Sequence, residues 1–420
     1  MLWRVKDRCR ISTVVLVLAL VATAFLPDLL AGKQDRAGRP DGSPSPATAQ
    51  ERVSARAALS PEMTSASFVD TSSADFSAGT LDAGTYVSET VDGEVILVPA
   101  FGTEFSDSSL PSGMSFSQWF PPNGTATVAG GKLTVDGVRV GTDALYGPGR
   151  TLEFSANFTG ASLNSSGLGQ TFAAAPWAVF RTGLFVFNLM AGTNDGASQD
   201  SNVPGSLFNS FHRYRIDWNA GSVAYYVDGA LAATHTNSPT ADMRPLFSDL
   251  FAGGKNQVVD WVRLTPYAPA GLFVSRVLDA GSTAHWLDLL ATAQMPDGTS
   301  IVFETRSGDT ATPDATWSDW QALGGGVIAS PDSRFIQYRA TLTTSDTSIT
   351  PEVESVTINY QTGCSEELCN GMDDDCDGQV DEGGASLCDD GNACTADACV
   401  EGQCVSRPTP DVQCSDGDAC

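Results

Sequence analysis

A short run of acidic residues near the carboxyl end has the spacing of a cation-binding loop. The segment Cys369–Glu382 reads CNGMDDDCDGQVDE, with aspartates on alternate positions followed by a glycine. Alternate side chains can point toward one centre, and the glycine permits the sharp turn that brings later ligands round. Carboxylates this close repel one another unless a cation or solvent neutralises them. The expected ligands are Asp373, Asp375, Asp377, the backbone carbonyl of Gln379, Asp381 and Glu382.

The ligand chemistry also indicates which cation this loop prefers. Its first nine positions follow the spacing of an EF-hand loop, but the twelfth is Gly384 rather than glutamate. We therefore do not expect a complete helix–loop–helix module. Carboxylate oxygens are hard ligands, so the sequence favours calcium over copper or zinc. The alternative interpretation is an acidic, solvated linker that binds no metal.

The cysteines are concentrated in the same part of the chain. Nine of the ten follow residue 363, which in an exported protein predicts a disulfide-stapled tail. Cys369 and Cys376 bracket the acidic loop and are placed to staple it. The unit CDDGNAC at Cys388–Cys394 recurs as CSDGDAC at Cys414–Cys420, so we expect this sequence to continue in a longer protein. The expected disulfide cysteines are Cys364, Cys369, Cys376, Cys388, Cys394, Cys399 and Cys404. The last four allow three pairings, among which the sequence does not choose.

The amino-terminal residues predict export. Four basic residues precede an apolar run, Ile11–Leu26, and polar sequence follows it. This arrangement is typical of a secretory signal over residues 1–31, and the run is also long enough for an uncleaved membrane anchor. In both cases the rest of the chain is expected to be extracellular or on the cell surface. Residues 32–67 are rich in Ala, Ser, Pro and Gly without periodicity, so we expect a flexible linker there.

Composition and charge narrow the class of protein. A chain of 420 residues is long enough for two or three domains, and 42% hydrophobic residues are enough for proper cores. Abundant glycine and proline, with few helical apolar patterns, favour an all-β protein. The net charge of −27 argues against nucleic acid and anionic membrane surfaces as partners. Residues 361–420 hold 15 acids and one base, Arg407, so the tail is a separate, cation-seeking unit.

The middle of the chain reads as short strands joined by turns. Tyr214, Ile216 and Trp218 alternate with polar residues, and two further strands with tight turns complete an antiparallel meander. A run of strands with few helices predicts a two-sheet sandwich. The expected strands here are Val95–Phe105, Arg213–Trp218, Ser222–Val227, Ala230–Thr236 and Val258–Leu264.

These strands carry a family resemblance. The sequence FHRYRIDWNAGSVAYYVDG, followed later by VVDWVRL, resembles the closing half of the concanavalin-like jelly roll of glycoside hydrolase family 16 and related laminin-G-type domains. We assign residues 68–268 to this lectin-like sandwich. A second, smaller β-sandwich is expected over residues 269–361, with strands at Ser300–Thr305, Phe335–Leu342 and Val353–Tyr360, and it resembles accessory modules of secreted bacterial proteins.

The tail resembles two kinds of small repeat. CNGMDDDCDGQVDE is similar to the MopE-type metal-binding repeat of bacterial surface proteins, which gives residues 362–384 as a metal-binding unit. CDDGNACTADACVEGQC is similar to cysteine-rich repeats often found beside it, which gives residues 385–420 as a truncated pair of such repeats.

The family resemblance implies a catalytic motif that this chain lacks. Family 16 enzymes are retaining glycosidases with two carboxylates about 5 Å apart, carried on one strand as E-x-D-x-E. The corresponding region, Leu184–Gly192, reads LFVFNLMAG and has no acid, and no glutamate occurs between Glu153 and Glu304. Asp195 and Asp200 follow in the next loop, but they are not on alternate strand positions. We therefore expect no catalytic residues and a binding function instead.

Aromatic rings are the candidate ligand-binding groups, because they stack against the apolar faces of sugars. The resemblance places six rings on strands that line the concave sheet, and the alternative for each is a place in the core. Trp177 and Tyr226 are expected to be exposed and to bind ligand, whereas Trp218 and Trp261 are assigned to the core. The six rings are Trp177, Phe180, Phe185, Phe187, Tyr225 and Tyr226.

Asp260, in VVDWVRL, matches a position at which some family 16 members bind a structural calcium. The alternative is an ordinary outward-facing aspartate. Together, these features predict a secreted or surface-anchored, non-enzymatic protein that binds an extracellular glycan or polysaccharide and holds calcium in its tail. A divergent family 16 glycosidase and a structural adhesin without glycan binding remain the two alternatives.

Overall fold

The computed structural model describes residues 64–185, 188–363, 366–375, 379–392 and 395–409. The chain divides into two compact parts, residues 1–59 and 60–420, and the described residues all belong to the part from 60 to 420. The expected signal or anchor segment and residues 32–63 of the expected linker therefore lie outside the described residues. Within the described part, no helix combines the length and apolar character that crossing a membrane requires.

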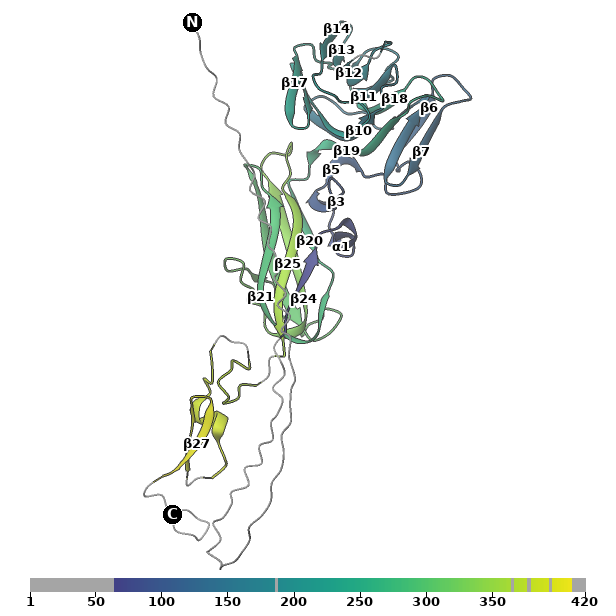
Figure 1. Ribbon diagram of the computed structural model, residues 1–420. Coiled ribbons are helices and arrows are strands. Elements are labelled where there is room, and N and C mark those ends of the chain that lie inside the picture. The colour runs from purple at the N-terminus through teal and green to yellow at the C-terminus, as the bar shows by residue number, and fades with distance from the viewer. Residues whose placement is uncertain (1–63, 186–187, 364–365, 376–378, 393–394, 410–420) are drawn as a thin grey trace, which may run out of the picture. The chain divides into compact units, whose positions relative to one another are not determined.

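The described chain is all-β, as the sequence predicts, and its first sandwich is built from two antiparallel sheets (Figure 1). The larger sheet has the order β17-β16-β15-β10-β19-β8-β7, and β5 also pairs with β19. Its strands are β5 (Pro99–Thr103), β7 (Thr125–Ala129), β8 (Lys132–Asp136), β10 (Arg150–Phe158), β15 (His212–Asn219), β16 (Ser222–Val227), β17 (Ala230–His235) and β19 (Gln257–Tyr267).

The opposing sheet has seven strands in the order β14-β13-β12-β11-β18-β9-β6. Its order does not follow the sequence, so strands far apart in the chain lie next to one another. The strands are β6 (Met114–Gln118), β9 (Val138–Thr142), β11 (Asn164–Gly169), β12 (Trp177–Thr182), β13 (Leu189–Asn194), β14 (Ser198–Asn202) and β18 (Arg244–Asp249).

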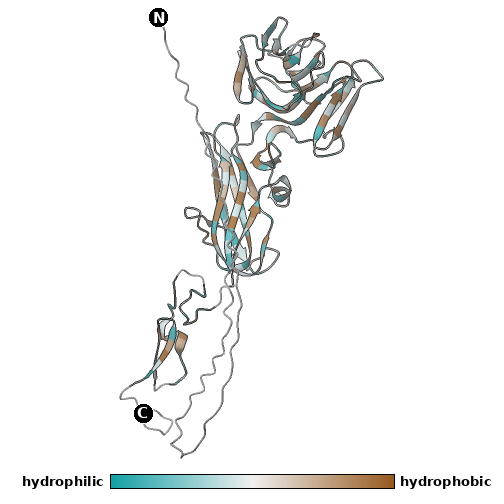
Figure 2. Cartoon of the chain, in the orientation of Figure 1, coloured by the Kyte–Doolittle hydropathy of each residue, from teal (hydrophilic) through white to brown (hydrophobic). Residues whose placement is uncertain are grey.

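Alternation along the strands builds the core between these two sheets (Figure 2). The meander forms as the sequence predicts, and Tyr214, Ile216 and Trp218 are fully buried on its inner face. The ring of Phe154, from β10, contacts Tyr214 at a centroid distance of 5.4 Å and Phe180 at 6.4 Å. Burial of such rings is the dominant favourable contribution to a sandwich of this kind.

Trp261 is buried, as expected, but it does not join the core cluster of the jelly roll. The register of β19 against β10 shifts between Ser155 and Ala156, which is a β-bulge. A bulge changes which residues point to which face, and Val262 rather than Trp261 joins the hydrophobic core. The ring of Trp261 is nonetheless buried, because the guanidinium groups of Arg263 and Arg213 lie 4.4 and 5.8 Å from it.

The second β unit is a ten-stranded sheet system with its own core. Its main path is β2-β20-β24-β21-β25-β4-β3, with β1 on β25 and with β22 and β23 joined to β24. The three strands expected here are confirmed within β22, β24 and β25. The strands are β1 (Thr64–Asp70), β2 (Thr80–Leu81), β3 (Thr85–Ser88), β4 (Glu94–Leu97), β20 (Ala270–Val274), β21 (Leu278–Gln294), β22 (Thr299–Gly308), β23 (Gln321–Ala322), β24 (Ser333–Thr344) and β25 (Glu352–Thr362).

The amino-terminal strands belong to this second unit rather than to the jelly roll. Residues 64–97 form β1 to β4 and the short helix α1 (Ser73–Ser77), whereas the jelly-roll strands begin with β5. The expected boundaries at residues 67 and 68 therefore differ from the strand pairing, in which β1 pairs along its length with β25. The expected strand Val95–Phe105 is also divided. Its first part pairs with β25 and its second part with β19, so the chain changes sheets at Val98.

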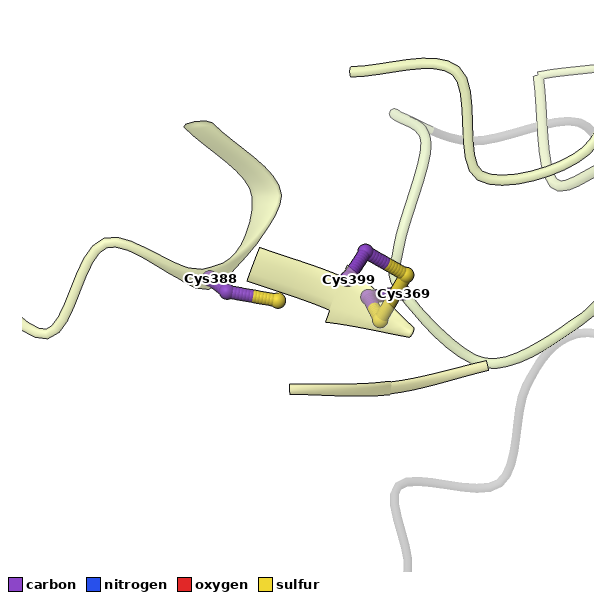
Figure 3. Close-up of side chains that lie close together, drawn as sticks. All are labelled: Cys369, Cys388 and Cys399. Atoms are coloured by element: carbon purple, nitrogen blue, oxygen red, sulfur yellow. A yellow bond between two sulfur atoms is a disulfide. The ribbon is translucent and has the colours of Figure 1, made fainter. Parts of the chain in front are cut away.

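The described residues of the tail have little regular structure, and two disulfide bonds join them. It contains the 3-10 helix η1 (Gly384–Cys388) and a hairpin of β26 (Thr395–Val400) and β27 (Gln403–Pro408). The bonds join Cys369 to Cys399 and Cys388 to Cys404, and Figure 3 shows the first of them beside the sulfur of Cys388.

This connectivity corrects two expectations about the cysteines. Cys369 does not staple the acidic loop to Cys376. Within the repeat, the Cys388–Cys404 bond belongs to one of the three pairings left open, but Cys399 pairs with Cys369 outside the repeat, so that pairing is not completed. The physical reason is that Cys369 comes from an earlier loop, which the repeat sequence does not contain and which the fold brings to Cys399 on β26. Cys364, Cys376 and Cys394 lie outside the described residues.

Candidate functional site

A pocket of about 160 Å³ lies on the outer face of the seven-stranded sheet, and we call it the groove. Its floor comes from the adjacent strands β12, β11 and β18, and its sides are two tryptophans. Side chains alternate between the two faces of these strands: Ser165 and Ser248 line the pocket, whereas their buried strand neighbours Asn164 and Asp249 lie on the other face. The lining residues are Trp119, Leu163, Ser165, Phe172, Trp177, Val179, Arg181, Ser248 and Leu250.

Trp119 forms one side of this groove. Its indole Nε1 donates a hydrogen bond to Ser248 Oγ at 2.8 Å, across 129 residues of sequence. The Arg139 guanidinium carbon lies 4.3 Å from the centre of the ring, and Arg139 Nη1 donates to the carbonyl oxygen of Thr171. Sequence reasoning missed Trp119, because no periodic pattern marks it and its partner is distant in the chain.

Trp177, which the sequence analysis named as a ligand-binding residue, forms the opposite side. The Arg181 guanidinium carbon lies 5.2 Å from the centre of its ring. Arg181 also binds Asp200 through two contacts, Nη2 to Oδ2 at 2.8 Å and Nε to Oδ1 at 3.3 Å. The half-buried indole of Trp177 is therefore fixed from one side and open to the groove on the other.

Gly192 leaves the space that this arrangement needs. A Cβ atom there would lie 2.7 Å from Asp200 Oδ1, 2.9 Å from Arg181 Nε and 3.0 Å from the Trp177 ring. We expect Gly192→Ala to displace these side chains while leaving the fold intact, because the contacts are with side-chain ends rather than backbone. Near-ultraviolet circular dichroism and tryptophan fluorescence should change. The thermal midpoint should stay within a few degrees, and a collapse of the whole unit would contradict the prediction.

Tyr226 does not share this face, which corrects the expectation that Trp177 and Tyr226 are exposed on the same sheet. It lies on β16 in the eight-stranded sheet, half-buried beneath Arg215, whose guanidinium carbon is 5.1 Å from its ring centre. The meander strands belong to the sheet opposite β12, so the two rings lie on different sheets.

The other four aromatic residues named from the sequence have different environments. Phe180 and Tyr225 are fully buried in the core, and Tyr225 Oη donates to the carbonyl of Gly192. Phe185 is 76% exposed outside the strands, and Phe187 lies outside the described residues. An exposed aromatic pair that the sequence analysis did not identify, Phe120 and Phe251, stacks at 6.5 Å, and each follows directly after a residue that lines the groove.

Carboxylates are sparse on the groove face. All residues of the seven strands are described, and the acids among them are Asp200 and Asp249. Asp200 is bound to Arg181, and Asp249 is 1% exposed and points away from the groove. Asp195 lies in the turn after β13, where its Oδ1 accepts a hydrogen bond from the backbone of Ala197. The outward positions of the central strand β12 are Trp177, Val179 and Arg181.

Asp249 belongs to a buried polar cluster between the sheets. Its Oδ1 accepts a hydrogen bond from the backbone of Phe251, while its Oδ2 has no hydrogen-bond partner among the described residues. Burial, with the nearby charge of Asp136, raises the pKa of the Asp249 carboxyl to about 7. Asn164 lies opposite it on β11 and is also fully buried.

The acidic loop of the tail is a second candidate site. Single carboxylate oxygens of Glu367, Asp375 and Glu382 lie within 4.8 Å of one another. Glu367 was missed by sequence reasoning, because it precedes the alternating pattern. Its Oε2 accepts hydrogen bonds from the backbone of Asp374 and Asp375, and its Oε1 from the backbone of Asp381. Glu367 thus organises the loop from outside the motif.

The other expected ligands are distributed differently. Asp381 Oδ1 accepts hydrogen bonds from the backbone nitrogens of Asn370 and Gly371, so it stabilises the loop and is not in the three-carboxylate cluster. Asp373 and Gln379 are described but are also outside that cluster, and Asp377 lies outside the described residues. The cluster consists of hard carboxylate oxygens, which are suited to calcium.

Asp260 lies apart from any carboxylate cluster that the described residues form. Its Oδ1 is 3.0 Å from Lys132 Nζ, and both side chains are partly exposed. An ammonium group therefore already neutralises this carboxylate. The geometry favours the ordinary surface aspartate over a calcium ligand.

Part of the jelly-roll sequence is similar to glycosyl hydrolases. The family model described as glycosyl hydrolases family 16 matches residues 180–257. A β-glucanase of Bacillus licheniformis is 17% identical, and the match covers 39% of this chain and 97% of that chain with a TM-score of 0.30. Porphyranase B of Zobellia galactanivorans is 12% identical, and the match covers 39% of this chain and 91% of that chain with a TM-score of 0.30.

A β-1,3-glucanase of Mycobacterium marinum is 13% identical, and the match covers 40% of this chain and 99% of that chain with a TM-score of 0.31. Comparison with curated proteins gave no match. The similarity to family 16 glycosyl hydrolases, expected from the meander and the last strand, is thus confirmed over residues 180–257, which contain the meander and three of the groove residues, Arg181, Ser248 and Leu250.

Proposed function

We propose that this protein binds a polysaccharide without cleaving it, in the groove between Trp119 and Trp177. The observation that carries the proposal is a pair of partly exposed indole rings on either side of a groove whose sheet has no outward carboxylate pair. Indole rings supply flat apolar surfaces for sugar rings. Cleavage by the retaining route needs two carboxylates about 5 Å apart.

Replacing Trp177 by alanine should weaken binding of the recognised polysaccharide by at least about tenfold, because the stacking surface is lost. Affinity electrophoresis or isothermal titration calorimetry measures this. Tyr226→Ala is the matched control, since Tyr226 is also stacked under an arginine but lies on the opposite sheet. Equal losses in both variants would contradict the assignment of the groove.

A divergent glycosidase is the second candidate, favoured by the match of residues 180–257 to family 16. Release of reducing sugars from a panel of β-glucans would support it, and loss of release in Asp195→Asn or Asp200→Asn would locate the reaction. A purely structural adhesin is the third candidate, and it predicts that no glycan on an array is retained.

We also propose that the tail loop binds calcium through Glu367, Asp375 and Glu382. Three carboxylates within 4.8 Å repel one another, and a divalent cation would relieve this repulsion. The proposed cell-surface location supplies calcium at concentrations that fill even weak extracellular sites. Asp373, Asp377 and the Gln379 carbonyl remain further expected ligands from the sequence pattern.

Millimolar calcium should therefore give a measurable heat of binding to the full chain and slow proteolysis of the tail, and a chelator should reverse both effects. Glu382→Gln should weaken binding by more than about tenfold, because one carboxylate ligand loses its charge. Glu354→Gln, in the second β unit, is the control. Unchanged proteolysis with calcium and with chelator would exclude the metal site.

A further inference from the structure

The groove face carries positive charge in a strongly acidic protein. The chain has 50 acids against 23 lysines and arginines, yet the outward side chains of the seven-stranded sheet include Arg139, Arg181 and Arg244. Asp200 is the outward carboxylate of these strands, and it pairs with Arg181. Among the outward residues of these strands, Arg139 and Arg244 therefore leave an excess of positive charge.

Arg139 and Arg244 have no carboxylate partner among the described residues. Arg244 donates to the carbonyl oxygens of Gln170 and Thr142, and Arg139 donates through one nitrogen to Thr171. The Nε atom of Arg139 is buried and has no hydrogen-bond partner in the described part of the chain. Burial and the nearby charge of Arg244 lower the pKa of Arg139. Like charges this close are unfavourable unless an anion lies between or beside them.

Both arginines are adjacent to the groove. Arg139 lies opposite Ser248 in the strand register and stacks on Trp119, and both of these residues line the groove. The backbone carbonyls that the arginines hold, at residues 170 and 171, directly precede the groove residue Phe172. A guanidinium beside an indole offers a sugar ring a stacking surface and an anionic substituent a charged donor at the same time.

We infer that the groove recognises an anionic polysaccharide, with Arg139 and Arg244 binding the negatively charged substituents while Trp119 and Trp177 stack on the sugar rings. This inference rests on the proposed glycan-binding function and names the class of glycan. The shared chemistry is a negative charge on the sugar ring, which comes either from a sulfate ester or from a carboxylate of a uronic acid.

The test compares three polysaccharides by calorimetry at 50 mM and 500 mM NaCl: a neutral galactan, a sulfated galactan and a polyuronate. We expect at least one anionic polymer to bind about tenfold or more tightly than the neutral one, and this preference to fall at high salt because the charges are screened. The sulfated and uronate arms identify the source of the charge.

Arg139→Gln and Arg244→Gln should each weaken binding of the anionic polymer by about tenfold and reduce the salt dependence of that binding. Arg215→Gln is the matched control, since Arg215 is likewise stacked on an aromatic ring but lies on the eight-stranded sheet. If one groove variant fails to fold, the other variant and the salt dependence of the unaltered protein still decide the matter.

The possible failures are distinguishable. Equal, salt-independent binding of neutral and anionic polymers would overturn this inference and leave the glycan-binding function in place. Full retention of anionic binding in both arginine variants would show that the two arginines only hold the loop before Phe172. Absence of binding to every glycan would overturn the proposed function itself.

Discussion

Asp249→Asn should raise the free energy of unfolding of the jelly roll by about 4 kcal/mol at pH 8.5, and by almost nothing near pH 4. Asp249 is 1% exposed, and its pKa is raised from 3.8 to about 7, chiefly because burial disfavours the charged form. Asparagine has nearly the same shape, keeps an oxygen for the backbone of Phe251 and carries no charge.

The direction of this pH dependence follows from whether the folded or the unfolded chain binds the proton on Asp249. Between pH 3.8 and 7 the folded chain holds a proton on Asp249 that the unfolded chain has released. Stability from this group therefore falls as the pH rises through that window, and above pH 7 the folded state contains a buried charge. The variant has no such group, so its advantage grows with pH and levels off above about pH 7.

Urea unfolding at pH 4, 6 and 8.5 measures this difference. Asp242→Asn is the matched control, since Asp242 is an exposed aspartate of the same sandwich and should give a change within about 0.5 kcal/mol. If Asp249→Asn were equally destabilising at all three pH values, the carboxylate would be making a favourable interaction that the described contacts do not contain.

Removing the Cys369–Cys399 bond should unfold the tail while leaving the two β units intact. The bond closes a loop with a sequence separation of 30, for which chain entropy gives about 3.5 kcal/mol. Among the described tail residues, only Asp374 and Cys388 are buried, so no hydrophobic core replaces the lost constraint. Small units without a core generally depend on disulfides or metals.

Limited proteolysis of a Cys369→Ser, Cys399→Ser double variant measures this effect, with rapid cleavage expected after residue 363. Calorimetric unfolding of the remaining β units should be unchanged. A double variant at Cys388 and Cys404, whose sequence separation is 16, is the comparison and should be nearly as susceptible. A tail that resists protease equally well without either bond would show that another interaction, such as bound calcium, holds it.

The meander illustrates what could be predicted from sequence. Its alternation, its two tight turns and its inward face at Tyr214, Ile216 and Trp218 all agree with the structure, because strand periodicity and turn residues are local properties. The same local reasoning gave the burial of Trp261 but not its separation from the jelly-roll core cluster, since a bulge in the pairing with β10 shifts the alternation. It also assigned residues 68–97 to the jelly roll, although β1, β2 and β4 pair with strands more than 190 residues away.

The sequence alone determined the all-β class, the meander, the acid-rich loop and the concentration of cysteines, because each depends on neighbouring residues. Only the tertiary structure decided that Trp119 opposes Trp177, that Tyr226 lies on the other sheet and that Glu367 joins Asp375 and Glu382. It also decided that Cys369 pairs with Cys399. The reason is that strand order and loop closure bring together residues far apart in the chain, and no local periodicity records which distant partner a side chain meets.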